Sequence, residues 1–310
     1  MNVWRNHMIY SPLRYPGGKG KLASFMELII QKVGCINGTY IEPFAGGAGI
    51  AINLLLNNVV SRIIINDLDK GIYSFWKAIL TEPQRFISDI YSIPLNMEEW
   101  LRQKKIYMCE SERYSYNLGF ATFYLNRTNR SGIIKGGVIG GRKQDGNWKM
   151  DVRFNRQNLA ARIQTIASQK NRIRIYNQDI DAFITRYMPK YIDNALIYFD
   201  PPYYEKGREL YMNFFRYEDH ARIMAKIRQL ENVKWIITYD YKPEILALYH
   251  DYECKRIKWS YSAAQKRSVD EIMIFHDPDM IPTKQELLAH KIHTTLQELS
   301  ESKNLMGCGR

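Results

Sequence analysis

The tetrapeptide Asp200-Pro201-Pro202-Tyr203, together with the apolar run before it, constrains the fold of this 310-residue chain more than any other feature. The run 195–199 has the sequence ALIYF, which is typical of a strand buried on both faces of a parallel sheet. The tetrapeptide would then lie at the carboxyl end of that strand, where ligands bind in open α/β sheets. Two successive prolines lack N–H donors and fix their φ angles, so they predict a rigid backbone there.

The residue types of this tetrapeptide indicate a particular kind of ligand. A carboxylate, a rigid main-chain carbonyl and an aromatic ring occur side by side. An exocyclic amino group on a planar heterocycle needs two acceptors for its two hydrogens and a ring on which to stack. The alternative interpretation is an ordinary turn after a strand, because Asp and Pro are common turn residues.

Strand-like and helical segments alternate along the chain. Parallel strands are predicted at 39–44, 62–65, 172–176, 195–199 and 234–239, and an antiparallel pair is predicted at 252–259 and 271–275. This alternation predicts an α/β Rossmann-like fold, in which helices cover both faces of a largely parallel sheet. An exposed helix over 284–300 and a terminal tail are expected to end the chain.

A glycine-rich turn follows the first predicted strand. The residues Pro43-Phe44-Ala45-Gly46-Gly47 lead into a helical pattern at 50–56, and glycines allow a ligand to approach the backbone closely. Asp67 ends the next strand, about twenty residues further on, where an acid can accept hydrogen bonds from ribose hydroxyls. An alternative role for Asp67 is to cap the helix that follows.

Positive charge is concentrated in the middle of the chain. The net charge is +12, and the segment 127–174 contains twelve Lys or Arg residues but only two acids, Asp145 and Asp151. The glycine-rich stretch 126–147 within it predicts an exposed hairpin or arm. A basic arm of this kind favours a polyanionic partner, and the alternative is a solvated basic face.

Composition argues against several classes of protein. No apolar run approaches the 18 residues of a transmembrane helix, and the first residues do not form a signal-peptide pattern. The four cysteines are scattered without the spacing of metal ligands. We therefore expect a cytoplasmic protein with reduced thiols, no bound metal and no membrane association.

Taken together and in this order, the motifs resemble those of Dam-type (D12 class) adenine-N6 DNA methyltransferases. The resemblance covers approximately residues 11–276. It is carried by LRYPGGK at 13–19, EPFAGGAG at 42–49, ND at 66–67, FYLNR at 123–127 with SG at 131–132, Asp179, DPPY at 200–203 and KRSVDE at 266–271.

The resemblance implies a cofactor, S-adenosyl-L-methionine, and a reaction. Asp200, Pro201, Pro202 and Tyr203 would be the catalytic residues, which transfer a methyl group to the N6 amino group of an adenine flipped out of double-stranded DNA. The residues expected around the cofactor are Tyr15, Lys19, Pro43, Phe44, Ala45, Gly46, Gly47, Asp67, Asp179, Ile180 and Asp200. Alternative roles are a solvated loop lysine for Lys19 and a helix cap for Asp179.

The resemblance also implies that an insert divides the catalytic domain. The catalytic parts would be 1–84 and 171–281, the mostly helical target-recognition domain 85–170, and the C-terminal helix and tail 282–310. The residues expected to contact DNA are Asn126, Arg127, Asn129, Arg130, Lys135, Arg142, Lys143, Lys266 and Arg267. The insert departs from that of members that read GATC, so this specificity is not transferred.

Other functions stay open at this point. They are the same chemistry on an RNA adenine, an inactive DNA-binding or partner-binding subunit, and a nicotinamide oxidoreductase built on the glycine turn. The intact glycine and DPPY motifs disfavour the inactive subunit, and the glycine spacing matches a nicotinamide site poorly. A cognate restriction nuclease is a further possible partner.

Overall fold

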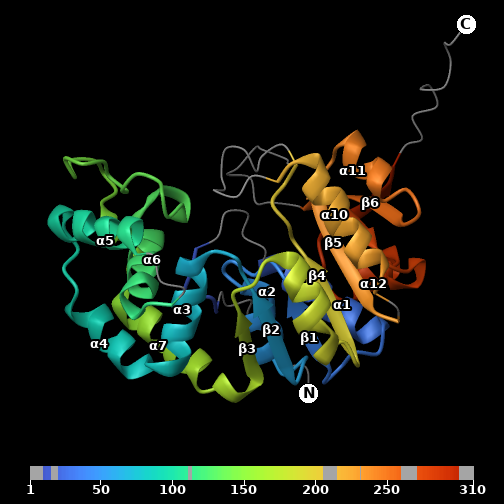
Figure 1. The fold of residues 1–310 in the computed structure, drawn as a ribbon, viewed down its shortest axis with the longest axis horizontal. Helices are drawn as coiled ribbons and strands as arrows, with labels where there is room; N and C mark the ends of the chain where they lie inside the picture. The colour runs from blue at the N-terminus through green and yellow to red at the C-terminus, as the bar shows by residue number, and fades with distance from the viewer. Residues whose placement is uncertain are drawn as a thin grey trace, which may run out of the picture.

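The computed structural model describes residues 10–14, 20–110, 114–204, 215–230, 232–259 and 271–299. They form an eight-stranded sheet in the order β3-β2-β1-β4-β5-β7-β6-β8 (Figure 1). The strands are β1 (Thr39–Glu42), β2 (Arg62–Asn66), β3 (Ile173–Tyr176), β4 (Ala195–Phe199), β5 (Lys234–Asp240), β6 (Glu253–Trp259), β7 (Glu271–Phe275) and β8 (Thr294–Glu298). The first five strands in the spatial order are parallel and the other three pair antiparallel, so the predicted α/β sheet is confirmed.

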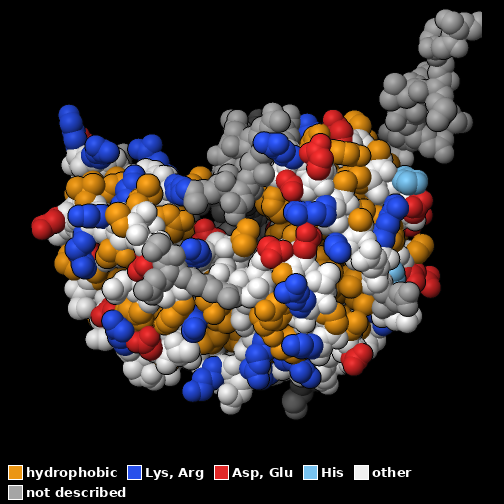
Figure 2. Space-filling view, viewed as in Figure 1, with side chains coloured by type: hydrophobic (Ala, Val, Ile, Leu, Met, Phe, Trp, Pro, Cys, Tyr) orange, Lys and Arg blue, Asp and Glu red, His pale blue; other side chains and the backbone are white. Residues whose placement is uncertain are grey.

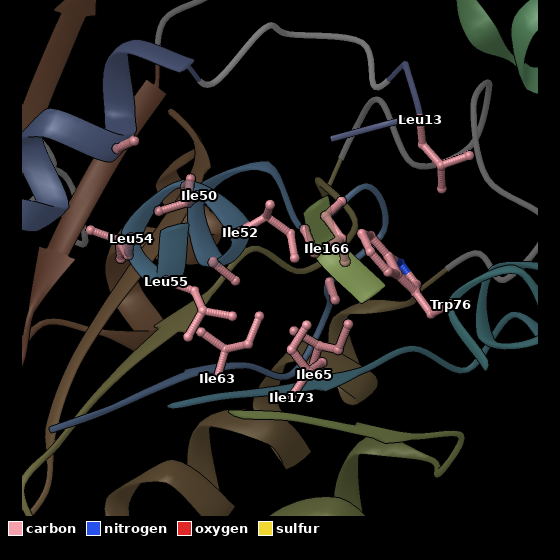
Figure 3. Close-up of a cluster of buried hydrophobic side chains, with 14 of the residues drawn as sticks. Leu13, Ile50, Ile52, Leu54, Leu55, Ile63, Ile65, Trp76, Ile166 and Ile173 are labelled. Atoms are coloured by element: carbon pink, nitrogen blue, oxygen red, sulfur yellow. The ribbon is translucent and has the colours of Figure 1, made fainter. Parts of the chain in front are cut away.

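Helices cover both faces of this sheet, which explains why its central strands are apolar throughout. On one face lie α1 (Gly20–Lys32), α2 (Gly49–Leu56), α3 (Lys70–Thr81) and α12 (Lys284–Ala289), and on the other α8 (Ile180–Ala182), α10 (Tyr217–Arg228) and α11 (Pro243–Leu248). In β2, Ile63 and Ile65 belong to the first core and Ile64 to the second. Figure 3 shows side chains of α2 directed toward Ile63 and Ile65.

A helical lobe lies beside the sheet, between β2 and β3 in the sequence (Figure 1). It consists of α4 (Pro83–Ser92), α5 (Met97–Cys109), α6 (Tyr116–Thr128) and α7 (Arg156–Ala167). Helix α6 is buried along nearly its whole length and packs against α3 and α5. The expectation that 126–147 is an exposed arm is therefore wrong at its start, because Asn126 to Asn129 belong to the interior.

The C-terminal prediction is wrong in its second half. Helix α12 ends at Ala289, and Lys291 then adopts a φ of 54°, which does not continue a right-handed helix. The segment Thr294–Glu298 forms β8, which extends the sheet by pairing antiparallel with β6. Its β-branched Thr294 and Thr295 suit a strand, and Glu298 forms a 2.7 Å ion pair with Lys255.

Among the described residues, none of the helices combines the length and the hydropathy that a membrane-spanning segment requires.

Candidate active site

Strand register places Thr238 next to the carboxylate of Asp200. Phe199 of β4 pairs with Ile237 of β5, so the residues that follow them are neighbours at the carboxyl end of the sheet. The Thr238 hydroxyl lies 3.0 Å from Asp200 Oδ1, to which it donates, and 2.7 Å from the hydroxyl of Tyr198. The half-buried Asp200 carboxylate is thus oriented by a side chain of the adjacent strand.

Strands β5 and β7 fix the residues that follow Asp200. The hydroxyl of Tyr203 donates to Glu271 Oε1 of β7 at 2.8 Å, and the main-chain N–H of Tyr204 donates to Asp240 Oδ1 of β5 at 2.9 Å. Pro201 is buried, whereas Pro202 and Tyr203 are half-buried.

The contributions of Thr238, Asp240 and Glu271 were not anticipated from the sequence. A polar residue near the end of an otherwise apolar strand was the available signal for Thr238. For Glu271 the sequence offered only a place in the KRSVDE motif, because its partner Tyr203 is distant in the chain.

The glycine turn is held open by contacts with its neighbours. Gly46 adopts a φ of +47°, a left-handed conformation that glycine tolerates, and its carbonyl accepts a 3.0 Å hydrogen bond from Trp76 Nε1. The buried amide of Asn66 donates to Pro43 O at 3.0 Å and to Gln178 O at 3.1 Å, and so ties the turn to the end of β3. The chain's own residues thus hold the turn in this conformation.

Asp67 lies directly against this turn. Its Oδ2 accepts a 2.8 Å hydrogen bond from Gly46 N–H, and its Oδ1 accepts one of 2.9 Å from Asp69 N–H. Burial, and then the negative charge of Asp69, raise the pKa of Asp67 to about 7 against the opposing effect of these two donors. The cap of α3 is Asp69, which accepts from Ile72 N–H, so the alternative role of helix cap does not fall to Asp67.

Asp179 and Ile180 follow β3. Asp179 is exposed and caps α8, with its Oδ1 accepting a 3.0 Å hydrogen bond from Ala182 N–H, while Ile180 is buried. The alternative role of Asp179 as a cap is therefore observed. Ionic or hydrogen-bonding contact with a cofactor stays a prediction for this residue.

Parallel pairing brings the predicted site residues to the same end of the sheet. Strand β1, which leads into the turn at Phe44, lies between β4, which leads into Asp200, and β2, which leads into Asp67. The rings of Phe44 and Phe215 are 6.1 Å apart and meet edge to face, which connects the glycine turn with the segment after DPPY. Tyr15 and Lys19 lie outside the described residues.

The residues predicted to contact DNA divide into two groups. Arg130, Lys135, Arg142 and Lys143 are exposed, whereas Asn126, Arg127 and Asn129 are buried. Figure 2 shows Lys and Arg side chains gathered at the upper left, over the loops above α5. Lys266 and Arg267 lie outside the described residues.

The three buried residues form hydrogen bonds with main-chain groups of the protein itself. Asn126 accepts from Arg14 N–H at 2.7 Å and donates to Arg14 O and Gly132 O, both at 2.8 Å. Arg127 Nε donates to Pro12 O at 2.6 Å, and Asn129 donates to Ile133 O and Ile134 O. The structure thus shows that these side chains satisfy buried main-chain groups, and direct contact with DNA stays a prediction for them.

Within the described part of the chain, no three His, Cys, Asp or Glu side chains are grouped so that they could hold a metal ion.

This chain is similar in sequence to known proteins. The family model for D12 class N6 adenine-specific DNA methyltransferase matches residues 15–263. The Type II methyltransferase M.MjaIII of Methanocaldococcus jannaschii is 24% identical over 269 residues, which cover 79% of this chain and 89% of that protein. A solved structure of the rRNA methyltransferase aviRa from Streptomyces viridochromogenes is 12% identical in sequence. The match covers 86% of this chain and 88% of the aviRa chain, with a TM-score of 0.37. The chain belongs to the D12 class of N6 adenine-specific DNA methyltransferases.

Proposed function

We propose that this enzyme transfers a methyl group from S-adenosyl-L-methionine to the N6 amino group of an adenine that has been flipped out of double-stranded DNA. The observation that supports it most is the grouping of Asp200 and Tyr203 with the glycine turn and Asp67 at one end of the sheet. Asp200 and Tyr203 suit an amino group on a planar base. The glycine turn and Asp67 suit a nucleoside cofactor.

The residues at the glycine turn fit such a cofactor. Each oxygen of Asp67 accepts one hydrogen bond from a main-chain N–H and retains a lone pair for a ribose hydroxyl. The turn brings main chain rather than bulky side chains toward the site, and Phe44 adds an apolar, half-buried surface. When bound, S-adenosyl-L-methionine supplies an electrophilic methyl group.

The chain's own residues act on the adenine. Its amino group is a weak nucleophile because the nitrogen lone pair is delocalised into the ring. Asp200 and the carbonyl of Pro201 accept hydrogen bonds from the two N–H groups of this amine. These hydrogen bonds favour a pyramidal nitrogen with a localised lone pair. Positioning and electrostatic stabilisation therefore account for the rate enhancement.

Tyr203 stacks on the flipped base. Its hydroxyl is held by Glu271, which fixes the plane of the ring before the base arrives. Unpairing a base costs a few kcal/mol, and contacts between DNA phosphates and exposed residues such as Arg130, Lys135 and Lys143 offset part of this cost.

Replacement of Asp200 tests this proposal. We expect Asp200→Ala to abolish methyl transfer from radiolabelled cofactor to duplex DNA, while most DNA binding is retained. Asp193→Ala is a matched control, because this exposed acid lies just before the amino end of the same strand and should leave transfer unchanged. A near-wild-type rate in Asp200→Ala would disprove the mechanism.

The choice of nucleic acid is tested in the same assay. Methyl transfer to duplex DNA should exceed transfer to an RNA of the same sequence, and methylome sequencing of an expressing host should find N6-methyladenine in a fixed context. Transfer to RNA alone would overturn the choice of DNA.

A further inference from the structure

Four arginines from distant parts of the sequence surround the N-terminal segment 10–14. They are Arg14 itself, Arg127 at the end of α6, Arg153, and Arg162 on α7; we call them the arginine cluster. Their guanidinium groups donate mainly to main-chain carbonyls: Arg127 to Pro12 O at 2.6 Å, Arg162 to Ser11 O at 3.1 Å and Arg14 to Asn129 O at 3.0 Å. Arg127 also reaches Arg153 O at 3.5 Å.

No member of the arginine cluster forms an ion pair with any residue that the structure describes, and the sequence 1–19 contains no acid at all. Elsewhere, Arg85, Arg102 and Arg222 each contact a carboxylate at 2.7–3.3 Å. No described carboxylate thus compensates the positive charge of the arginine cluster.

The electrostatics of Arg127 reflect this imbalance. Burial, followed by the charges of Arg162, Arg14 and Arg153, lowers the pKa of its guanidinium to about 9. The pKa of Arg14 is lowered as well, first by burial and then by Arg153. A group of like charges in a partly desolvated place is stabilised when an anion binds among them.

Bracing of main-chain carbonyls does not by itself explain the cluster. Each guanidinium has five N–H donors, and the contacts above use one or two of them in Arg14, Arg127 and Arg162. The side chain of Arg153 is exposed and donates to no group among the described residues. A neutral amide could satisfy the same carbonyls without repulsion between neighbouring cations.

We propose that the arginine cluster binds one phosphate group of the DNA backbone. The proposal rests on DNA being the substrate. Guanidinium groups match phosphate oxygens in geometry, and several around one anion form a specific contact. The cluster joins the segment 10–14 to α6, to α7 and to the basic segment between these two helices, which contains Arg153.

The location gives this phosphate a role in positioning. The Ser11 hydroxyl donates to Gly47 O of the glycine turn at 2.5 Å, and Arg14 is joined to α6 through Asn126. The segment 10–14 therefore connects the helical lobe to the glycine turn. A phosphate held against it would fix the register of the DNA relative to the active site.

The test uses Arg153→Gln, because this exposed residue can lose its charge without disturbing a contact within the described chain. The matched control is Arg62→Gln, which changes an exposed arginine at the amino end of β2, whereas the site lies at the carboxyl ends of the strands. Duplex binding is measured at several salt concentrations without cofactor. We expect Arg153→Gln to weaken binding by about threefold to tenfold and to lower the salt slope by about 0.9, with Arg62→Gln unchanged.

Neutral methylphosphonate linkages identify the ligand. At one backbone position, a methylphosphonate linkage should weaken DNA binding by the wild type but should not further weaken DNA binding by Arg153→Gln. In the salt titration, Arg153→Lys should recover most of the wild-type slope. An unchanged slope in Arg153→Gln, or the absence of any such coupled position, would overturn the proposal.

Titration with inorganic phosphate distinguishes the other source of this anion. If phosphate binds the wild type tightly and no linkage in DNA is coupled to Arg153, the site takes a free anion and the assignment to DNA is wrong. These readouts do not depend on methyl transfer. A wild-type protein that binds DNA through the cluster yet fails to methylate it would contradict the proposed function alone.

Discussion

Charged side chains serve different purposes at the sheet and in the segment 129–155, which joins α6 to α7. At the sheet, Arg222 contacts Asp181 and Asp219 at 3.2 and 3.3 Å, and Arg228 contacts Asp251 at 2.8 Å. In the segment, six basic side chains make neither an ion pair nor a side-chain hydrogen bond to another described residue: Arg130, Lys135, Arg142, Lys143, Lys149 and Arg153. The charges of Arg222 and Arg228 are compensated within the chain, whereas the charges of these six side chains are available to an external anion.

The two regions also differ in how firmly their other functional groups are held. At the carboxyl end of the sheet, Asp200, Tyr203 and the backbone of Tyr204 are each bound by a side chain from another strand. In the segment, Trp148 is 70% exposed in a glycine-rich loop. Catalysis requires side chains that are held in position before the substrate binds. Recognition of a polyanion requires side chains that are still free to make contacts.

Removal of the Thr238 hydroxyl should have the largest effect. Thr238→Val keeps the shape of the side chain but leaves Asp200 without this donor, so we expect kcat to fall about tenfold to 100-fold with little change in KM. Thr238→Ser should recover most of kcat. Tyr198→Phe is the control, because it removes the other hydrogen bond of Thr238. We expect this variant to lower the melting temperature and to have little effect on kcat. Equal kcat in Thr238→Val and the wild type would show that Asp200 needs no such support.

Charge reversal in the segment should have the next largest effect. Lys143→Glu replaces an exposed cation with an anion, so we expect duplex DNA to bind about tenfold more weakly, with a smaller salt slope and an unchanged melting temperature. Arg62→Glu serves as the control for a change of net charge far from the segment. If both variants weaken binding equally, the overall charge of the protein governs affinity and the contrast fails.

The parallel strands could be predicted from sequence because burial on both faces leaves an unbroken apolar run. The sequence predicts β4 at its observed bounds, and it predicts β1, β2 and β5 to within two residues at each end. β8 was missed because Thr294–Glu298 is a short strand at the edge of the sheet, with a composition that also suits a helix. Pairing with β6, which is distant in sequence, decides its structure.

Single-sequence reasoning was least informative about buried polar residues. Asn126 and Arg127 look like components of an exposed basic loop, yet they are buried because they satisfy carbonyls of residues 12–14 and 132. Thr238 and Glu271 support the site through contacts that form only when β4, β5 and β7 lie side by side. The pattern of hydrophobic residues in the sequence does not predict such contacts between strands.

The pH dependence of cofactor binding tests the role of Asp67. Because its pKa is raised to about 7, the carboxyl is largely protonated at pH 6 and largely ionised at pH 8. An ionised carboxylate is the better acceptor for ribose hydroxyls, so we expect affinity for S-adenosyl-L-methionine to rise several-fold over this interval. Asp67→Asn should bind more weakly and lose this dependence. A flat profile in the wild type would argue against contact between Asp67 and the ribose.

The smallest effect is expected for an ion pair at the sheet. Arg222→Gln removes the contacts with Asp181 and Asp219, but these side chains are partly exposed, so the free energy of unfolding should fall by about 1 kcal/mol or less. Chemical denaturation measures this change, and duplex binding should keep its affinity and its salt slope. Weaker DNA binding by Arg222→Gln at unchanged stability would mean that paired charges at the sheet also contribute to recognition, so that the two regions differ in degree rather than in purpose.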